Sequence, residues 1–329
     1  MDKKMRDINW AVLGTGVIAH QMADALAEHG RKIYAVGNRT HDKAVAFADQ
    51  YGIGKVYDDF HQIFSDPDVD VIYITTPHNT HAAFMKEAIE NGKHLLVEKS
   101  ITLNSEELDQ MLSLAEDHGT IIAEAMTIYH MPLYTELKRR LDRGDFGRVN
   151  LITMNFGSFK DYDMKNRFFN RSLAGGAMLD IGVYALSFIR WFMDSSPDQM
   201  KSMMRQAPTG VDEEGALLLQ NPEGQLATVM LSMHSKQPKR GMISCEKGYI
   251  EIMEYPRACQ AYFTDATTGE REEITAGDTG EALYYEMTDM EEAIRGDRDH
   301  IYIQYTKDVM DLMTRFRREW GVVYPEEER

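Results

Sequence analysis

The sequence predicts an α/β protein of two domains: an N-terminal domain built on a parallel sheet covered on both faces, and a C-terminal domain of helices and a mainly antiparallel sheet. Three observations lead to this prediction. A glycine-rich turn joins an apolar run to an amphipathic helix near residue 14, strand and helix patterns alternate up to about residue 125, and hairpin-like turns separate strands in the second half. We therefore expect domains at residues 1–125 and 126–329.

The glycine-rich turn has the pattern of a dinucleotide-binding fingerprint. Residues 10–13 form an apolar run that predicts a buried strand, and Gly-Thr-Gly-Val-Ile-Ala follows it into a helix. Gly14 permits a tight turn, Gly16 lets the backbone approach a pyrophosphate, and Ala19 allows the helix to lie close to the strand. The N-terminus of a helix also offers unpaired N–H groups to a phosphate. We therefore predict a Rossmann domain whose phosphate-binding residues are Gly14, Thr15, Gly16, Val17 and Ile18.

The rest of the first domain follows the same alternation. Gly92 and Gly119 end two of the expected helices, and Asn104 with Glu107 has the spacing of a capping box. We expect strands at residues 33–37, 69–75, 94–97 and 120–123, and helices at residues 41–51, 80–91 and 104–118.

After residue 125 the pattern changes from alternation to a helix-rich part followed by hairpins. The turns at residues 221–224, 246–248 and 267–270 each contain glycine between strand-like runs, which favours antiparallel pairing. We expect helices at residues 133–143, 177–193, 281–295 and 306–320, a strand at 148–156, and a polar, aromatic loop at 160–171.

Composition narrows the classes of function. The formal net charge of −17 disfavours nucleic acids and anionic membranes as partners. Cys245 and Cys259 are the only cysteines, too few for a disulfide framework or a thiolate metal centre, and we expect no bound metal. The sequence shows no apolar run that we would assign to a signal peptide or a membrane span, so we expect a cytoplasmic protein.

Two polar segments follow strands at the edge where ligands bind in such sheets. The first, residues 75–79 (Thr-Thr-Pro-His-Asn), either lines the nicotinamide half of a dinucleotide or simply caps the next helix. The second, Glu98-Lys99, follows the apolar residues 95–97. A lysine after a strand is often a solvated charge, but its place at the same edge as the glycine turn favours a role in proton transfer near the nicotinamide.

The most informative stretch of the second half is Gly-Gly-Ala-Met-Leu-Asp-Ile-Gly-Val-Tyr at residues 175–184. Asp180 and Tyr184 are four residues apart and share one face of the expected helix. Each has a structural alternative, since Asp180 could satisfy the helix dipole and Tyr184 could be a core tyrosine. An acid and a tyrosine on one face of a buried helix favour a functional pocket with Lys99.

Together these motifs resemble the glucose–fructose oxidoreductase and inositol dehydrogenase family (Gfo/Idh/MocA). The resemblance rests on the N-terminal glycine turn, on residues 76–81 (Thr-Pro-His-Asn-Thr-His), on residues 92–94 with Glu98-Lys99, and on the stretch at 175–184. It implies a Rossmann domain followed by an α/β domain with a large open sheet, and transfer of a hydride between a pyridine nucleotide and a sugar, polyol or related alcohol. It also places Lys99, Asp180 and Tyr184 at catalytic positions. Tyrosine at 184 is similar to glucose–fructose oxidoreductase and the dimeric dihydrodiol dehydrogenases, where many members have histidine. Ser100 departs from the proline that usually follows the lysine.

On this interpretation the site residues can be assigned. Tyr184 exchanges the proton, Lys99 holds the reacting oxygen and lowers the tyrosine pKa, and Asp180 orients the lysine or the substrate hydroxyl. Residues 38–40 lack the acid typical of an NAD site, which favours NADP over NAD. The further residues expected to bind the cofactor are Asn38, Arg39, Thr40, Thr76, Pro77, His78, Asn79, His81, Glu98 and Lys99. The residues expected to bind a hydroxylated substrate are Tyr129, His130, Lys160, Asn166, Arg167 and Phe168.

Two other classes compete with this interpretation. A catalytically silent, dinucleotide-sensing regulator could use the same fold, although it would be expected to lack Lys99, Asp180 or Tyr184. A Rossmann methyltransferase fits poorly, because nothing after the glycine turn resembles a methyl-acceptor site. Residues 226–234 alternate between an apolar face and a mixed face, which predicts a homodimer or a dimer of dimers through the C-terminal sheet.

Overall fold

The computed structural model describes residues 7–328, which divide into two compact units. Unit 1 comprises the chain up to Thr102, Glu106–Ala125 and Leu283–Ile303; unit 2 comprises Leu103–Ser105, Met126–Ala282 and the chain from Gln304 on. The expected boundary after residue 125 agrees with this division, but the expectation that the second domain runs unbroken from 126 to 329 is wrong. The physical reason is the apolar face of helix α9 (Ala282–Arg295), because its buried residues join the core of unit 1.

Unit 1 is built on a six-stranded sheet in the order β3-β2-β1-β4-β5-β6. Every neighbouring pair is parallel, so the predicted parallel sheet is confirmed. The order reverses between the two central strands β1 and β4, which is the switch point where ligands bind in such sheets. The strands are β1 (Trp10–Leu13), β2 (Ala35–Gly37), β3 (Lys55–Val56), β4 (Val71–Ile74), β5 (His94–Glu98) and β6 (Ile122–Ala125).

The helices of unit 1 bury apolar stripes against this sheet. Met22 and Leu26 of α1, Phe47 of α2 and Met287 of α9 share one core with Trp10 of the central strand. The indole Nε1 of Trp10 donates to Glu291 Oε1 of α9 over 2.8 Å, which adds a polar tie to this core. Besides α9, the helical segments of this part of the chain are α1 (Val17–Glu28), α2 (His41–Tyr51), α3 (Gln62–Ser65), η2 (His78–Thr80), α4 (His81–Glu90) and α5 (Ser105–His118).

Unit 2 contains an eight-stranded sheet in the order β14-β13-β12-β11-β7-β10-β9-β8. All neighbouring strands pair antiparallel except β7 and β10, which are parallel, and the three predicted hairpins are confirmed. The strands are β7 (Val149–Gly157), β8 (Gln199–Gln206), β9 (Asp212–Gln220), β10 (Leu226–Ser232), β11 (Gln237–Cys245), β12 (Gly248–Met253), β13 (Gln260–Asp265) and β14 (Arg271–Thr275).

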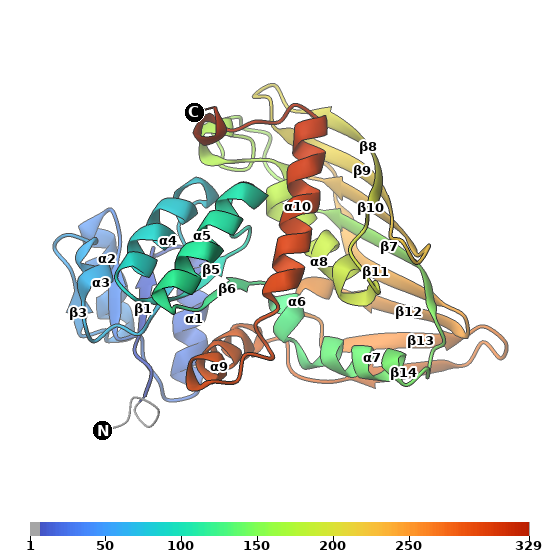
Figure 1. Cartoon of the computed structure of the whole chain (residues 1–329), viewed down its shortest axis with the longest axis horizontal. Helices are drawn as coiled ribbons and strands as arrows, with labels where there is room; N and C mark the ends of the chain where they lie inside the picture. The colour runs from blue at the N-terminus through green and yellow to red at the C-terminus, as the bar shows by residue number, and fades with distance from the viewer. Residues whose placement is uncertain (1–6, 329) are drawn as a thin grey trace. The chain divides into compact units, whose positions relative to one another are not determined.

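Helices cover one face of this sheet, and Figure 1 shows α8 and α10 on the same side of it. The close approach of α8 depends on a glycine of the sheet, since a Cβ at Gly241 would lie 2.6 Å from the ring of Phe188. The helical segments are α6 (Thr127–His130), α7 (Pro132–Asp142), η3 (Arg171–Leu173), a π-helix (Met178–Gly182), α8 (Val183–Phe192), η5 (Tyr255–Arg257), α10 (Ile303–Glu319) and η6 (Pro325–Glu327).

The segment Arg171–Phe192 is long and apolar enough, by length and composition alone, to cross a membrane. This differs from the expectation that no apolar run reaches that length. However, 83% of its most apolar window is buried inside the protein, which is typical of the core helix of a globular protein. The run is apolar all round because protein surrounds it on most sides.

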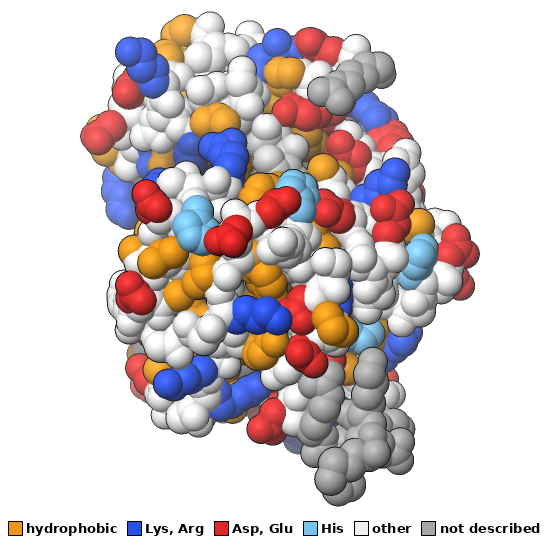
Figure 2. Space-filling model, turned by 90° about the vertical axis from the view of Figure 1, so that its left-hand side faces the viewer, with side chains coloured by type: hydrophobic (Ala, Val, Ile, Leu, Met, Phe, Trp, Pro, Cys, Tyr) orange, Lys and Arg blue, Asp and Glu red, His pale blue; other side chains and the backbone are white. Residues whose placement is uncertain are grey.

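The opposite face of the eight-stranded sheet carries exposed apolar side chains. Along β10, Ala227 and Val229 are fully buried whereas Leu226 and Met230 are 39% and 48% exposed, which confirms the predicted alternation up to residue 230. Ser232, expected on the same face as Met230, is buried. Elsewhere on the surface, acidic and basic side chains are interspersed in the view of Figure 2 rather than gathered by sign.

Candidate active site

The glycine turn of unit 1 has the geometry of a phosphate-binding loop. Gly14 has φ +107°, and its N–H donates to Gly37 O over 2.8 Å, which ties the turn to the neighbouring strand. A Cβ at Gly14 would lie 2.6 Å from Thr75 Oγ1, so only glycine fits. At Gly16, in contrast, no atom of the described residues, apart from its own chain neighbours and helix, lies within 4 Å of the position a Cβ would take.

The N-terminus of α1 follows directly. Gly16 occupies the N-cap position, and it offers no side chain to the first N–H groups of the helix. The first turn also contains no acidic residue, and Val17 is 77% exposed. These N–H groups and the open space above Gly16 suit an anionic group such as a pyrophosphate.

The end of β4 lies beside this turn. Thr75 N donates to Leu13 O over 2.9 Å, and its hydroxyl donates to the same oxygen over 3.1 Å. The Thr80 hydroxyl donates to Thr76 Oγ1 over 2.7 Å, and Pro77 is exposed. The two ends of the central strands therefore form one edge, as the switch-point argument predicts.

His78 and His81 hold the backbone that follows β5. His78 Nε2 lies 3.0 Å from Lys99 O, and because a carbonyl can only accept, Nε2 carries the proton. His81 is fully buried, with Nε2 2.8 Å from Thr76 O and Nδ1 3.2 Å from the carbonyl oxygens of Ser100 and Ile101. Burial lowers the pKa of His81, although the hydrogen bonds to carbonyl oxygens act in the opposite direction. His81 therefore holds the backbone around Thr76 and Ser100, and its expected contact with a cofactor stays a prediction.

Lys99 follows β5 at this edge and is half-buried. The peptide bond between Lys99 and Ser100 is cis. The preceding Glu98 accepts a hydrogen bond from the hydroxyl of Tyr73, whereas Ile101 N donates to Glu124 Oε1 over 3.1 Å. The backbone after Lys99 is thus held by a side chain of a neighbouring element, and the Glu98 side chain before Lys99 is held by another.

The segment after β2 carries the residues predicted to choose the cofactor. Asn38 Nδ2 donates to Thr40 O over 3.0 Å, which orders a tight turn, and Arg39 and Thr40 are exposed. This turn presents no carboxylate of its own between residues 38 and 40.

In unit 2, Asp180 lies inside the π-helix and Tyr184 in the first turn of α8. Single π-helical turns within α-helices often mark functional sites. Asp180 is 9% exposed, and its Oδ1 lies 3.8 Å from Arg167 Nη2 of the preceding loop. The ring of Tyr184 is half-buried and faces Phe156 of β7 at a centroid distance of 6.0 Å.

The loop before the π-helix brings together three of the residues expected to bind substrate. Lys160 Nζ lies 4.1 Å from the centre of the Phe168 ring, and the Arg167 guanidinium lies 4.2 Å from it. Asn166 Oδ1 accepts from Phe168 N over 3.3 Å, which closes a local turn. The loop therefore presents two cationic donors around one aromatic ring, a set that suits a hydroxylated ligand.

Tyr129 and His130 come from a different segment of the chain. Both lie in α6 and are buried, and the Tyr129 ring packs against Trp191 at 5.8 Å and Tyr305 at 5.9 Å. The Tyr129 ring therefore takes part in helix packing, and its expected role in substrate binding stays a prediction.

Sequence reasoning missed Asp212, which lies beneath the start of the π-helix. Its Oδ2 accepts a hydrogen bond from Met178 N over 2.6 Å, and its side chain is 1% exposed. Burial raises the pKa of Asp212 to about 7. The one available signal was the run of three acids at residues 212–214. Successive side chains of a regular strand point to opposite faces of the sheet, so a run of three acids places at least one on the buried face.

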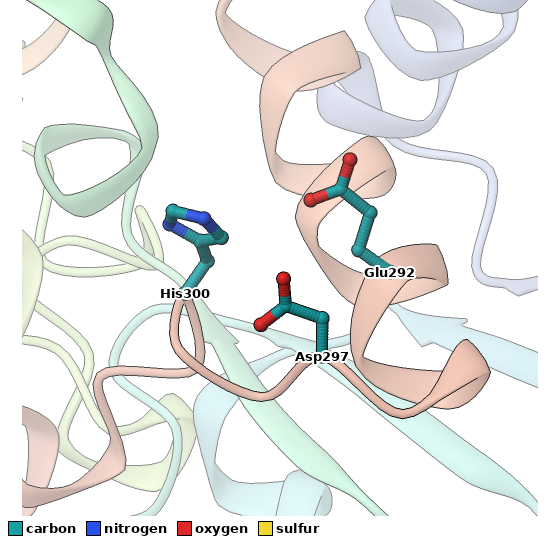
Figure 3. Close-up of side chains that lie close together, drawn as sticks. All are labelled: Glu292, Asp297 and His300. Carbon is teal, nitrogen blue, oxygen red and sulfur yellow. The ribbon is translucent and has the colours of Figure 1, made fainter.

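A separate cluster lies in unit 1, where Glu292 of α9 faces Asp297 and His300 of the following loop (Figure 3). One ligand atom from each of the three lies within 4.8 Å of the others, close enough to surround a cation. Glu292 and Asp297 are exposed, and exposed carboxylates gather in this way in many proteins without a metal.

Comparison with known proteins agrees with this geometry. Residues 8–126 match the oxidoreductase family with an NAD-binding Rossmann fold, and residues 134–251 match the GFO/IDH/MocA C-terminal domain. The chain is 26% identical over 341 residues to mouse trans-1,2-dihydrobenzene-1,2-diol dehydrogenase, covering 98% of this chain and 99% of the relative. It is 30% identical to an uncharacterized oxidoreductase of Rhizobium meliloti, over 68% of each chain.

Solved structures share the fold at lower identity. A 3-ketoreductase from Actinomadura kijaniata, crystallised with TDP-benzene and NADP, superposes with a TM-score of 0.84 at 20% identity over 95% of this chain and 98% of its own. Levoglucosan dehydrogenase in complex with NADH and levoglucosan gives 0.83 at 18% identity over 98% and 100%. The chain therefore belongs to the GFO/IDH/MocA family and is an NAD(P)-dependent oxidoreductase, as its motifs predicted.

Proposed function

We propose that the enzyme transfers a hydride between NADP and the carbinol or carbonyl carbon of a sugar, polyol or dihydrodiol. The observation that carries this proposal is the similarity to dihydrodiol dehydrogenase over 98% of the chain, together with the presence of Lys99, Asp180 and Tyr184. A silent regulator would not need this set of proton-transferring side chains.

The residues of unit 1 fit a dinucleotide. The space at Gly16 admits a pyrophosphate, and the uncapped N-terminus of α1 donates to it. Thr76, Pro77 and Asn79 at the end of β4 supply the edge for the rest of the cofactor. When bound, the nicotinamide supplies or accepts the hydride.

The chain's own groups handle the proton. Tyr184 exchanges a proton with the reacting oxygen, and Lys99 holds that oxygen and lowers the pKa of the tyrosine. Asp180 orients the lysine or a substrate hydroxyl, and its carboxylate lies 3.8 Å from the Arg167 guanidinium. Lys160 and Arg167 donate to further hydroxyl groups of the substrate.

The preference for NADP rests on the turn at Asn38, Arg39 and Thr40. The guanidinium of Arg39 is exposed and can bind a 2′-phosphate, which the uncharged Asn38 does not repel. Arg39→Ala is expected to weaken NADP binding about 10-fold and NAD binding by less than about 2-fold, as measured by calorimetric titration. Equal losses for both cofactors would indicate that Arg39 stacks on adenine instead.

A substrate screen tests the activity itself. Sugars, polyols and dihydrodiols are offered with NADP and with NAD, and the absorbance of reduced nicotinamide is followed. We expect turnover with at least one of these classes, and its loss in Tyr184→Phe. Tight binding of NADP without turnover on any class would favour the regulator instead.

We further propose that the enzyme is a homodimer, or a dimer of dimers, through the open face of the eight-stranded sheet. Three exposed methionines, Met203, Met230 and Met253, lie there at 79%, 48% and 47% exposure. Strand register places all three in one row across the sheet. Met203 and Met230 both pair with Ala216. Met230 also pairs with Asn155, Asn155 pairs with Arg240, and Arg240 pairs with Met253. Flexible apolar side chains arrayed on one flat face suit a protein contact.

A further inference from the structure

The approach to the π-helix leaves no room for side chains at its two glycines. Gly176 has φ +129°, and a Cβ there would lie 2.4 Å from Asp212 Oδ1. A Cβ at Gly175 would lie 2.6 Å from Arg167 O. Two adjacent glycines are conformationally permissive, so something outside them must fix the direction in which the helix starts.

A β-bulge places Asp212 where it can do this. Arg205 pairs with Glu214 and Gln206 pairs with Asp212, so Glu213 is an extra residue on β9. At such a bulge, two successive side chains need not point to opposite faces of the sheet. Asp212 is consequently buried beneath the helix start, where it accepts from Met178 N over 2.6 Å.

The C-terminal segment holds the same glycines from another side. The Tyr324 hydroxyl donates to Gly175 O over 2.7 Å, and the tyrosine is fully buried. Tyr324 N in turn donates to Glu327 Oε2 over 2.9 Å, and Glu327 pairs with the buried guanidinium of Arg317 at 2.8 Å. Arg317 also donates to Leu103 O and to Val322 O, which anchors this segment within unit 2.

We propose that Asp212 and Tyr324 are positioning residues that fix the Gly175–Gly176 approach and so present Asp180 and Tyr184 in one orientation. This inference rests on the function proposed above for Asp180 and Tyr184. Burying a carboxylate under a helix start is costly unless it satisfies a specific donor, and here it satisfies the first N–H of the π-helix. Small displacements of reacting groups lower turnover strongly, so this support acts on kcat rather than on binding.

The first experiment compares two substitutions of Asp212. Asp212→Ala removes the acceptor and is expected to lower kcat about 10-fold, with KM and the Kd for NADP changed by less than about 2-fold. Asp212→Asn keeps an acceptor oxygen at the same place and is expected to retain kcat within about 3-fold. An alanine variant with wild-type kcat, or an asparagine variant as slow as the alanine variant, would overturn the proposal.

A double-mutant cycle separates positioning from a general loss of structure. Combined with Asp180→Asn, the alanine substitution at 212 is expected to cost about 3-fold in kcat rather than 10-fold, because one of the two groups that it positions is already disabled. If the fold-losses in kcat of the two single variants multiply in the double variant, the proposal is contradicted. Tyr324→Phe should lower kcat about 3-fold, whereas Tyr134→Phe, which removes a comparable buried bond to Tyr255 O, should leave kcat unchanged.

Hydrogen–deuterium exchange gives a readout that needs no substrate. The amides of residues 176–182 are expected to exchange about 10-fold faster in Asp212→Ala than in the wild type, while those of α10 stay unchanged. Unchanged exchange at residues 176–182 would refute the positioning role. If instead Asp180→Asn and Tyr184→Phe keep normal turnover, the proposed function fails while the exchange result still decides the role of Asp212.

Discussion

Alanine at Gly14 and alanine at Gly16 should separate the stability of the glycine turn from its ability to bind a cofactor. At Gly14 the φ of +107° is unfavourable for alanine by about 1–2 kcal/mol. The new Cβ would also lie 2.6 Å from Thr75 Oγ1 and displace its hydrogen bond to Leu13 O, which adds about 1 kcal/mol. We therefore expect Gly14→Ala to lower the free energy of unfolding of unit 1 by about 2–3 kcal/mol.

Gly16→Ala is the matched control because the same atom is added two residues away. The φ of −81° at Gly16 suits any residue, and within residues 7–328 no atom beyond its chain neighbours and helix lies within 4 Å of the added Cβ. Alanine is a poorer N-cap than glycine, which destabilises the fold, but it also lowers the conformational entropy of the unfolded chain, which stabilises the fold. These two effects nearly cancel, so the free energy of unfolding should change by less than about 0.5 kcal/mol. The methyl group would nevertheless fill the space above the helix N-terminus, and NADP affinity should fall about 10-fold or more.

Chemical denaturation followed by circular dichroism measures the stability term, and calorimetric titration with NADP measures the binding term. We expect opposite outcomes for the two variants: Gly14→Ala is destabilised, whereas Gly16→Ala is stable but binds NADP poorly. If Gly16→Ala binds NADP as the wild type does, the pyrophosphate does not sit at this turn. If Gly14→Ala is as stable as the wild type, the steric argument from Thr75 is wrong.

Three further predictions concern catalysis, assembly and pH. Lys99→Met and Tyr184→Phe should each lower kcat about 100-fold with little change in NADP affinity by calorimetry; near-normal rates on an identified substrate would refute their roles. Met230→Glu should convert the dimer to a monomer by light scattering, whereas Val45→Glu, at an exposed site of α2, should not; a monomeric wild type at micromolar concentration would refute the interface. Burial raises the pKa of Asp212 from 3.8 to about 7, so this carboxyl stabilises the fold fully below pH 3.8 and loses that contribution as pH rises through about 7. The free energy of unfolding of Asp212→Asn, measured in denaturant between pH 4 and pH 8, should lack this fall of up to about 4 kcal/mol, and parallel curves for both proteins would contradict it.

Local patterns predicted unit 1 well because each of its elements is specified by neighbouring residues. The strand at residues 10–13 and the helix at 41–51 occur with the predicted bounds, and the glycine turn joins β1 to α1 as expected. The return of α9 to unit 1 could not be predicted, because an amphipathic pattern shows that a face is buried but not which core buries it.

The sites in unit 2 depended on features that no local pattern encodes. The sequence predicts one continuous helix over residues 177–193, whereas the structure has a π-helix at Met178–Gly182 before α8. Residues on every side of this run are buried, so its apolar pattern has no period that could distinguish the two helix types. Gly182 explains part of the difference, since a Cβ there would lie 3.0 Å from Leu231 Cδ1 of β10. The wider helix, the glycine against the sheet and the bulge that buries Asp212 all depend on the packing of β9 and β10 against residues 175–182. It is this packing, set by contacts distant in sequence, that decides how Asp180 and Tyr184 are held.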